Sequence, residues 1–115
     1  MTEDDPQAIR ARLAAAREAL LRESDAASDS RGVVELDQTS VGRLSRIDAL
    51  QGQAMAQATE RRRAAAIRRI DQALARLEAG DYGICVVCGE AIAPRRLALD
   101  PAIATCLDCA RGGDR

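Results

Sequence analysis

The sequence predicts a mainly α fold, in which a long antiparallel helical hairpin (a coiled coil) is followed by a small module with four cysteines. Three observations support this prediction. Apolar residues recur at helical spacing over two long stretches, and all four cysteines come after residue 80. The chain is 47% hydrophobic but only 1% aromatic, with Tyr82 as its single ring. Small apolar side chains suit closely packed helices better than a globular core.

The first helix is predicted at about residues 6–23. Asp5 followed by Pro6 is typical of a helix start, because an aspartate accepts bonds from free backbone N–H groups and proline fits the first helical position. The apolar residues that then recur at helical spacing are Ile9, Leu13, Ala16 and Leu20. From residue 24 to 41 this pattern gives way to Ser, Asp and Gly, and the stretch 23–37 carries a net charge of −4. We predict an acidic connection, or tip, at residues 24–41.

The second helix is predicted at about residues 42–79, and it completes a hairpin over residues 1–80. Gly80 suits the residue that follows a helix end. The apolar residues expected on its buried face are Leu44, Ile47, Met55, Ala58, Ala66, Ile70, Leu74 and Leu77. The first helix pairs with only the second half of this helix in this interpretation.

Residues 81–115 are predicted to form a zinc-finger module with a short C-terminal tail. Two C-x-x-C pairs, Cys85 with Cys88 and Cys106 with Cys109, are separated by seventeen residues. Two intervening residues let a tight turn aim both sulfurs at one tetrahedral ion. Because the chain has no histidine, we expect one structural Zn²⁺ in a closed four-thiolate site. A thioredoxin-type dithiol is the alternative, but two pairs at metal spacing and no βαβ pattern count against it.

Composition argues against several classes of protein. The net charge of −1 is unlike that of a general nucleic-acid binder. The acidic N-terminus and the lack of an apolar run of ~20 residues predict a cytoplasmic protein without a membrane span. No nucleophile–base set is visible and no histidine is present, so we expect a protein that is not an enzyme.

The cysteine module and the helix before it resemble the DksA/TraR family of bacterial transcription regulators. The resemblance is carried by Gly80-Asp81-Tyr82-Gly83-Ile84-Cys85-Val86-Val87-Cys88-Gly89, Ile92-Ala93-Pro94-Arg95-Arg96-Leu97, Pro101 and the second cysteine pair. Residues 35–50 look like those of the shorter DksA-like proteins. The resemblance implies a monomer that binds bacterial RNA polymerase directly, with a coiled coil entering the secondary channel, and without sequence-specific binding to DNA.

The resemblance also implies an acidic tip, which this sequence matches only in part. The D-x-x-D-x-A motif of DksA is absent, and Asp48-Ala49 is the nearest fragment. Asp37 is the other candidate. Each acid is either a polymerase-contacting tip residue or a solvated charge near a helix end.

Basic residues form a second candidate contact surface. Arg62 and Arg69 match helix positions of the guanosine tetraphosphate site of DksA, but Asp100 and Ala110 stand where DksA has basic side chains, so support for that nucleotide is weak. The candidate basic contacts to polymerase are Arg62, Arg69, Arg95 and Arg96. Their alternative role is a solvated surface paired with acids of the first helix.

Two other functions fit parts of the sequence. A zinc-ribbon nucleic-acid binder is opposed by the balanced charge and by the scarcity of aromatic rings for base stacking. A zinc-stabilised coiled-coil adaptor for another protein stays open, because a fold does not by itself specify a partner.

Overall fold

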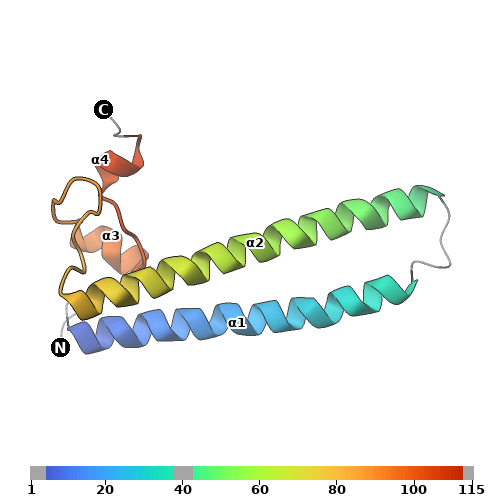
Figure 1. Cartoon of the computed structure of the whole chain (residues 1–115), viewed down its shortest axis with the longest axis horizontal. Helices are drawn as coiled ribbons and strands as arrows, with labels where there is room; N and C mark the ends of the chain where they lie inside the picture. The colour runs from blue at the N-terminus through green and yellow to red at the C-terminus, as the bar shows by residue number, and fades with distance from the viewer. Residues whose placement is uncertain (1–4, 38–42, 113–115) are drawn as a thin grey trace. The chain divides into compact units, whose positions relative to one another are not determined.

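The computed structural model describes residues 5–37 and 43–112, and side chains for residues 5–28 and 46–112. It contains four helices (Figure 1): α1 at Pro6–Asp37, α2 at Arg43–Ala79, α3 at Pro94–Leu99 and α4 at Leu107–Ala110. The described part of the chain has no strand beyond one isolated antiparallel bridge between Ile84 and Ala91. None of its helices combines the length and apolar character needed to cross a membrane. The predicted class, a helical hairpin followed by a four-cysteine module, is confirmed.

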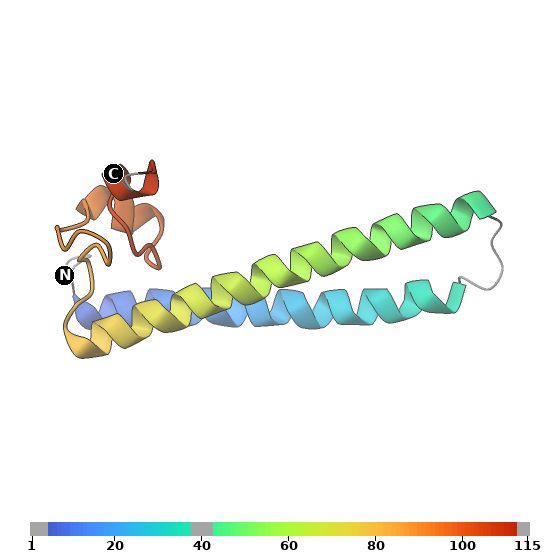
Figure 2. The same ribbon diagram turned by 45° about the horizontal axis from the view of Figure 1, so that its top comes forward.

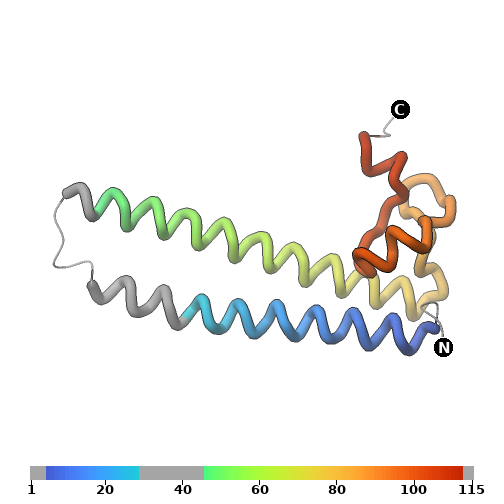
Figure 3. Tube along the Cα trace, turned by 180° about the vertical axis from the view of Figure 1, so that it is seen from behind, coloured from blue at the N-terminus to red at the C-terminus, as the bar shows by residue number. Residues whose placement is uncertain are grey.

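The chain divides into two compact units. Unit 1 comprises Met1–Arg17 and Arg68–Arg115, and unit 2 comprises Glu18–Ile67. Within each unit, α1 and α2 lie side by side and run antiparallel (Figures 1 and 2). In unit 1 the chain after α2 turns back, so that α3 lies beside the paired helices (Figure 3). A boundary at residue 80 between the hairpin and the zinc-finger module stays a prediction.

Helix α1 is longer than the sequence suggests. The prediction ended this helix at residue 23, but the helix continues to Asp37. Residues 24–37 are therefore helical, and the prediction of a connection there is wrong. The rest of the predicted connection, 38–41, lies outside the described residues.

Pairing with α2 explains the extra length of α1. Ser24 and Ala27 are half-buried at the same alternating spacing as Leu20, so the side of α1 that faces α2 continues through small residues. The Ser24 hydroxyl donates a hydrogen bond to the carboxylate of Glu60 on α2. Contacts of this kind stabilise a helix whose own propensity is weak.

Helix α2 lies within one residue of the predicted range, but its buried face differs in unit 2. One row of half-buried residues there follows alternating steps of four and three, and consists of Ala49, Gln53, Ala56, Glu60 and Arg63. Glu60 and Arg63 of this row bond to side chains of α1. We call this row the α2 seam. Ile47 and Met55, predicted to be buried, are 46% and 71% exposed. In a coiled coil, the residues that face the partner helix recur every 3.5 positions, whereas the large apolar residues of α2 recur about every 3.6 positions. Over several turns the two rows therefore move apart around the helix.

The predicted start of α1 and the predicted end of α2 are confirmed. At the start of α1, the Asp5 carboxylate accepts a bond of 3.2 Å from the backbone N–H of Gln7. At the end of α2, Gly80 has a φ of 83°. This conformation lets the backbone N–H of Asp81 donate to the Arg76 carbonyl at 2.8 Å. Glycine adopts such a positive φ without the strain that a Cβ would add.

The buried side chains gather in unit 1. Among the described residues, those buried from water are Ile9, Leu13, Ile70, Ala73, Cys85, Ile92 and Ala102. Ion pairs from Arg10 to Glu78 and from Arg17 to Asp71, both 2.8 Å long, set the antiparallel register of α1 and α2 here. The described part of unit 2 has no fully buried apolar side chain. Its helices are joined instead by polar contacts and small residues.

Candidate metal centre

The first cysteine pair lies in a tight turn between α2 and α3. The backbone N–H of Cys85 donates to the Glu90 carbonyl at 2.8 Å, and the Gly89 N–H donates to the Cys85 carbonyl at 3.0 Å. Gly83 and Gly89, which flank this turn, take positive φ values, 86° and 79°. These bonds close the turn and direct Cys85 and Cys88 to the same side of it.

The second cysteine pair begins α4. Cys106 has an extended backbone and precedes the first helical residue, and its carbonyl accepts a bond of 3.0 Å from the Ala110 N–H. Cys109 lies one turn along this short helix. The Val86 N–H donates to the Ala104 carbonyl at 2.9 Å, so the first turn is bonded to the segment that leads into the second.

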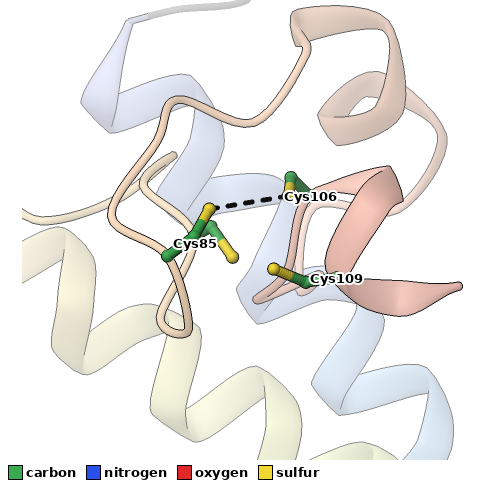
Figure 4. Close-up of side chains that lie close together, drawn as sticks. Cys85, Cys106 and Cys109 are labelled. Carbon is green, nitrogen blue, oxygen red and sulfur yellow. Dashed lines mark hydrogen bonds between the residues drawn. The ribbon is translucent and has the colours of Figure 1, made fainter. Parts of the chain in front are cut away.

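The four sulfurs converge on one point. All of them lie within 4.8 Å of one another. The sulfurs of Cys88 and Cys106 are 3.7 Å apart, close to the edge of about 3.8 Å expected for a tetrahedron with Zn–S bonds of about 2.3 Å. In the close-up, the sulfurs of Cys85, Cys106 and Cys109 face a common space (Figure 4). The four cysteines are therefore placed to bind one metal ion through four thiolates.

The thiols differ in their pKa values. A hydrogen bond from the backbone N–H of Cys88 lowers the pKa of Cys85 to about 6. For Cys109, the hydrogen bond with the Cys106 thiol, followed by burial, raises the pKa to about 12. The pKa of Cys88 is also raised: a backbone bond from Glu90 lowers it, but burial and the neighbouring thiols together outweigh that bond. Near neutral pH, a metal ion must therefore displace protons from Cys88 and Cys109.

Zinc affinity should consequently depend steeply on pH. Because the raised pKa values of Cys88 and Cys109 require at least these two thiols to lose protons, affinity should rise by at least about a hundredfold per unit between pH 6 and pH 8. Below pH 6, Cys85 with its pKa of about 6 is also protonated, and the dependence should steepen. Chelator competition across this pH range measures the slope, and proton release in weak buffer gives an independent count. A flat profile would contradict the assignment of these thiols as ligands.

The candidate tip residues lie in unit 2. Asp37 is the last residue of α1, and its side chain is outside the described part. Asp48 is exposed on α2, whereas Ala49 is half-buried in the α2 seam. A role for these residues at a polymerase surface stays a prediction.

Two of the four candidate basic contacts are bound within unit 1. The guanidinium of Arg69 forms an ion pair of 2.9 Å with Asp100. Arg96 donates to the backbone carbonyl just before Cys106 at 3.0 Å. By contrast, Arg62 donates to a threonine one turn away on α2, and Arg95 is exposed. The structure thus gives Arg69 and Arg96 intramolecular contacts that the sequence did not predict.

The sequence also missed the side chains that support the cysteine module from the helices. Three of them donate hydrogen bonds to backbone carbonyls at the end of α3 and between α3 and α4: Arg12 to Ala98 at 2.9 Å, Arg76 to Ile103 at 3.4 Å, and Tyr82 to Pro101 at 2.7 Å. Only Tyr82, as the single ring of the chain, gave a signal in the sequence. The two arginines are indistinguishable in sequence from solvated helix residues.

Comparison with known proteins places this module in a family. Residues 80–112 match the prokaryotic DksA/TraR C4-type zinc finger. An uncharacterized protein of Aquifex aeolicus (strain VF5) is 45% identical over 51 residues, which are 44% of this chain and about a third (35%) of that protein's length. The structure of transcription factor DksA2 from Pseudomonas aeruginosa has the same fold, with a TM-score of 0.81 and 24% identity, over 97% of this chain and 84% of DksA2.

All four clustered cysteines lie inside the matched range 80–112. The predicted cofactor, one structural zinc ion, is therefore confirmed. Residues 80–112 are therefore recognised as a DksA/TraR C4-type zinc finger, and the chain shares its overall fold with DksA2.

Proposed function

We propose that this protein is a transcription regulator that binds RNA polymerase directly through the secondary channel and acts through the acidic end of its helical hairpin. The observation that carries the proposal is the combination of a paired α1 and α2 with a four-cysteine module, in the fold of a transcription factor, over 97% of the chain. The fold and the zinc-finger match are those of regulatory proteins, and we propose that this chain has no enzymatic activity.

The charge of the hairpin supports this mode of action. Residues 23–37 of α1 carry a net charge of −4, although the whole chain is at −1. Carboxylates are the ligands that magnesium prefers, so an acidic helix end suits an approach to the catalytic magnesium of polymerase. The zinc ion, in this proposal, stabilises unit 1 and takes no part in chemistry.

Binding to core RNA polymerase is the direct test. The zinc-loaded chain, labelled with a fluorophore, should bind purified core polymerase at micromolar concentration, and a protein that occupies the secondary channel should compete with it. Duplex DNA alone should not bind at physiological salt. Failure to bind core enzyme would reject the proposal and favour an adaptor for another protein, whereas salt-sensitive binding to DNA would favour the zinc-ribbon function.

The acidic tip should act after docking. We expect Asp37→Asn and Asp48→Asn to change polymerase affinity by no more than about fivefold, because exposed charges contribute roughly 0–1 kcal/mol to an interaction. The effect on transcription from a responsive promoter should fall much further, because the carboxylate itself is needed at the active centre. Affinity and in vitro transcription are measured on the same preparations.

Glu18→Gln is a matched control for the tip, because Glu18 is an exposed acid of α1 outside the acidic stretch 23–37. It should leave both readouts unchanged. If a tip variant loses affinity and activity in equal proportion, that residue is a docking contact instead.

The candidate basic contacts are tested best at Arg62 and Arg95. Both lack an intramolecular ion pair among the described residues, whereas Arg69 and Arg96 make contacts within unit 1. Under this proposal, Arg62→Ala and Arg95→Ala weaken polymerase binding without changing zinc content. Unchanged affinity would assign them to the solvated surface.

A further inference from the structure

The backbone from the end of α3 to the second cysteine pair is held from three separate places. We call residues 98–103 the linker. Arg12 on α1 donates to its first carbonyl at 2.9 Å, and Arg76 on α2 donates to its last at 3.4 Å. Tyr82, which follows α2, donates to the Pro101 carbonyl between them at 2.7 Å.

The linker is also ordered within itself. One carboxylate oxygen of Asp100 accepts from the Ala102 N–H at 3.1 Å, and the other accepts from Arg69 on α2 at 2.9 Å. The Ala102 side chain is buried, with 5% of its surface exposed. The residue after the linker, Ala104, is bonded to the first cysteine turn. The linker therefore has little freedom to move relative to either the helices or that turn.

We propose that the paired helices are a working part of the zinc site, because they hold the linker that presents the second pair of ligands. Arg12, Arg76 and Tyr82 are the positioning residues. Through the linker they set Cys106 and Cys109 opposite the first pair before metal binds. Arg12 and Arg76 lie outside residues 80–112, so the zinc finger recognised by its sequence is smaller than the unit that binds zinc.

The physical reason is preorganisation. A metal site loses affinity when one pair of its ligands must be ordered at the moment of binding, since that ordering costs conformational entropy. Hydrogen bonds that hold the linker beforehand remove part of this cost. Coupling of this kind is reciprocal, so zinc must order the linker to the extent that the linker strengthens zinc binding. This inference does not depend on the partner of the protein.

Zinc affinity of the intact chain tests one direction of the coupling. Arg12→Ala and Tyr82→Phe should each weaken Zn²⁺ binding by about threefold to tenfold, as expected for loss of one hydrogen bond. The affinity is measured by Co²⁺ titration followed by Zn²⁺ displacement. Arg10→Ala is the matched control. Arg10 also lies on α1 and forms a 2.8 Å ion pair, but its partner is Glu78 on α2, not the linker. This control should bind zinc like wild type.

The titration of Tyr82 tests the opposite direction of the coupling, namely whether bound zinc orders the linker. As the only aromatic residue, it can be titrated alone by its ultraviolet absorbance. Burial raises its pKa above 10.0, against the opposing charges of Arg12 and Arg76, while Asp100 adds to the rise. Chelation of zinc should return this pKa toward 10 in wild type and in Arg10→Ala.

Two results would overturn the proposal. One is equal zinc affinity for Arg12→Ala, Tyr82→Phe and Arg10→Ala, each verified to retain wild-type helicity when zinc is bound. The other is a Tyr82 titration that does not change when zinc is removed. Tyr82→Phe keeps the buried ring, so it carries the affinity test by itself if Arg12→Ala fails to fold.

Discussion

Removal of zinc should unfold the two cysteine turns, residues 83–92 and 104–112, with loss of their amide protection, and should loosen the linker between them. The reason is the small core of the module, in which only Cys85, Ile92 and Ala102 are buried. A core of this size cannot offset the conformational entropy of ordering the segment. Structural zinc typically supplies about 10–16 kcal/mol to such a site. Hydrogen exchange measured by mass spectrometry, before and after chelation, gives the change for each peptide.

A pair of substitutions separates metal loss from simple disturbance of the turn. Cys88→Ser should abolish zinc retention and expose the same amides as chelation does. Val87→Ser is the control, because Val87 is adjacent to Cys88 but is 64% exposed and is not a ligand. It should keep one zinc per chain. If the module retains its protection after chelation, its stability does not come from the metal.

Leu13→Ala should produce the largest loss of stability from any single change in the helices. Leu13 is fully buried, at 0% exposure, where α1 packs on α2 in unit 1. Truncation of a buried leucine costs about 2–5 kcal/mol, because apolar contacts are lost and a cavity is left. The free energy of unfolding is measured with urea at saturating zinc, so that metal binding does not vary between variants.

Leu50→Ala gives the matched control on α2. Leu50 is 62% exposed, and its truncation should change the free energy of unfolding by less than about 0.5 kcal/mol. Equal effects at both positions would mean that Leu13 is not the centre of this packing. A large effect at Leu50 alone would show that the outer face of α2 is covered in solution.

The metal centre could be predicted from sequence because its constraints are local. The two residues between the cysteines of each pair keep their two sulfurs close enough to bind the same ion. Because the chain has no histidine, no imidazole could replace a cysteine as ligand. The helix ends at Asp5 and Gly80 were predictable for the same reason, since each depends on one side chain or one φ angle. The resemblance to the family rested on this same local segment.

Contacts between distant parts of the chain could not be predicted in this way. Ser24 of α1 meets Glu60 of α2 beyond the predicted end of the first helix, and Met55 is exposed although the sequence pattern predicts it to be buried. Arg12 resembles any solvated helix arginine until the fold brings it to the linker. The spacing of apolar residues shows that a segment is helical, but it does not show which face of the helix another part of the chain covers.

The sequence by itself determined the helical hairpin, the four-thiolate zinc site, the start of α1 and the end of α2, because each follows from spacing or from the chemistry of a few adjacent residues. Only the tertiary structure decided how far α1 extends, which residues form the α2 seam, and how the helices hold the linker beside the zinc ligands. These features depend on pairs such as Arg76 and Ile103, whose energy exists only once the chain has folded.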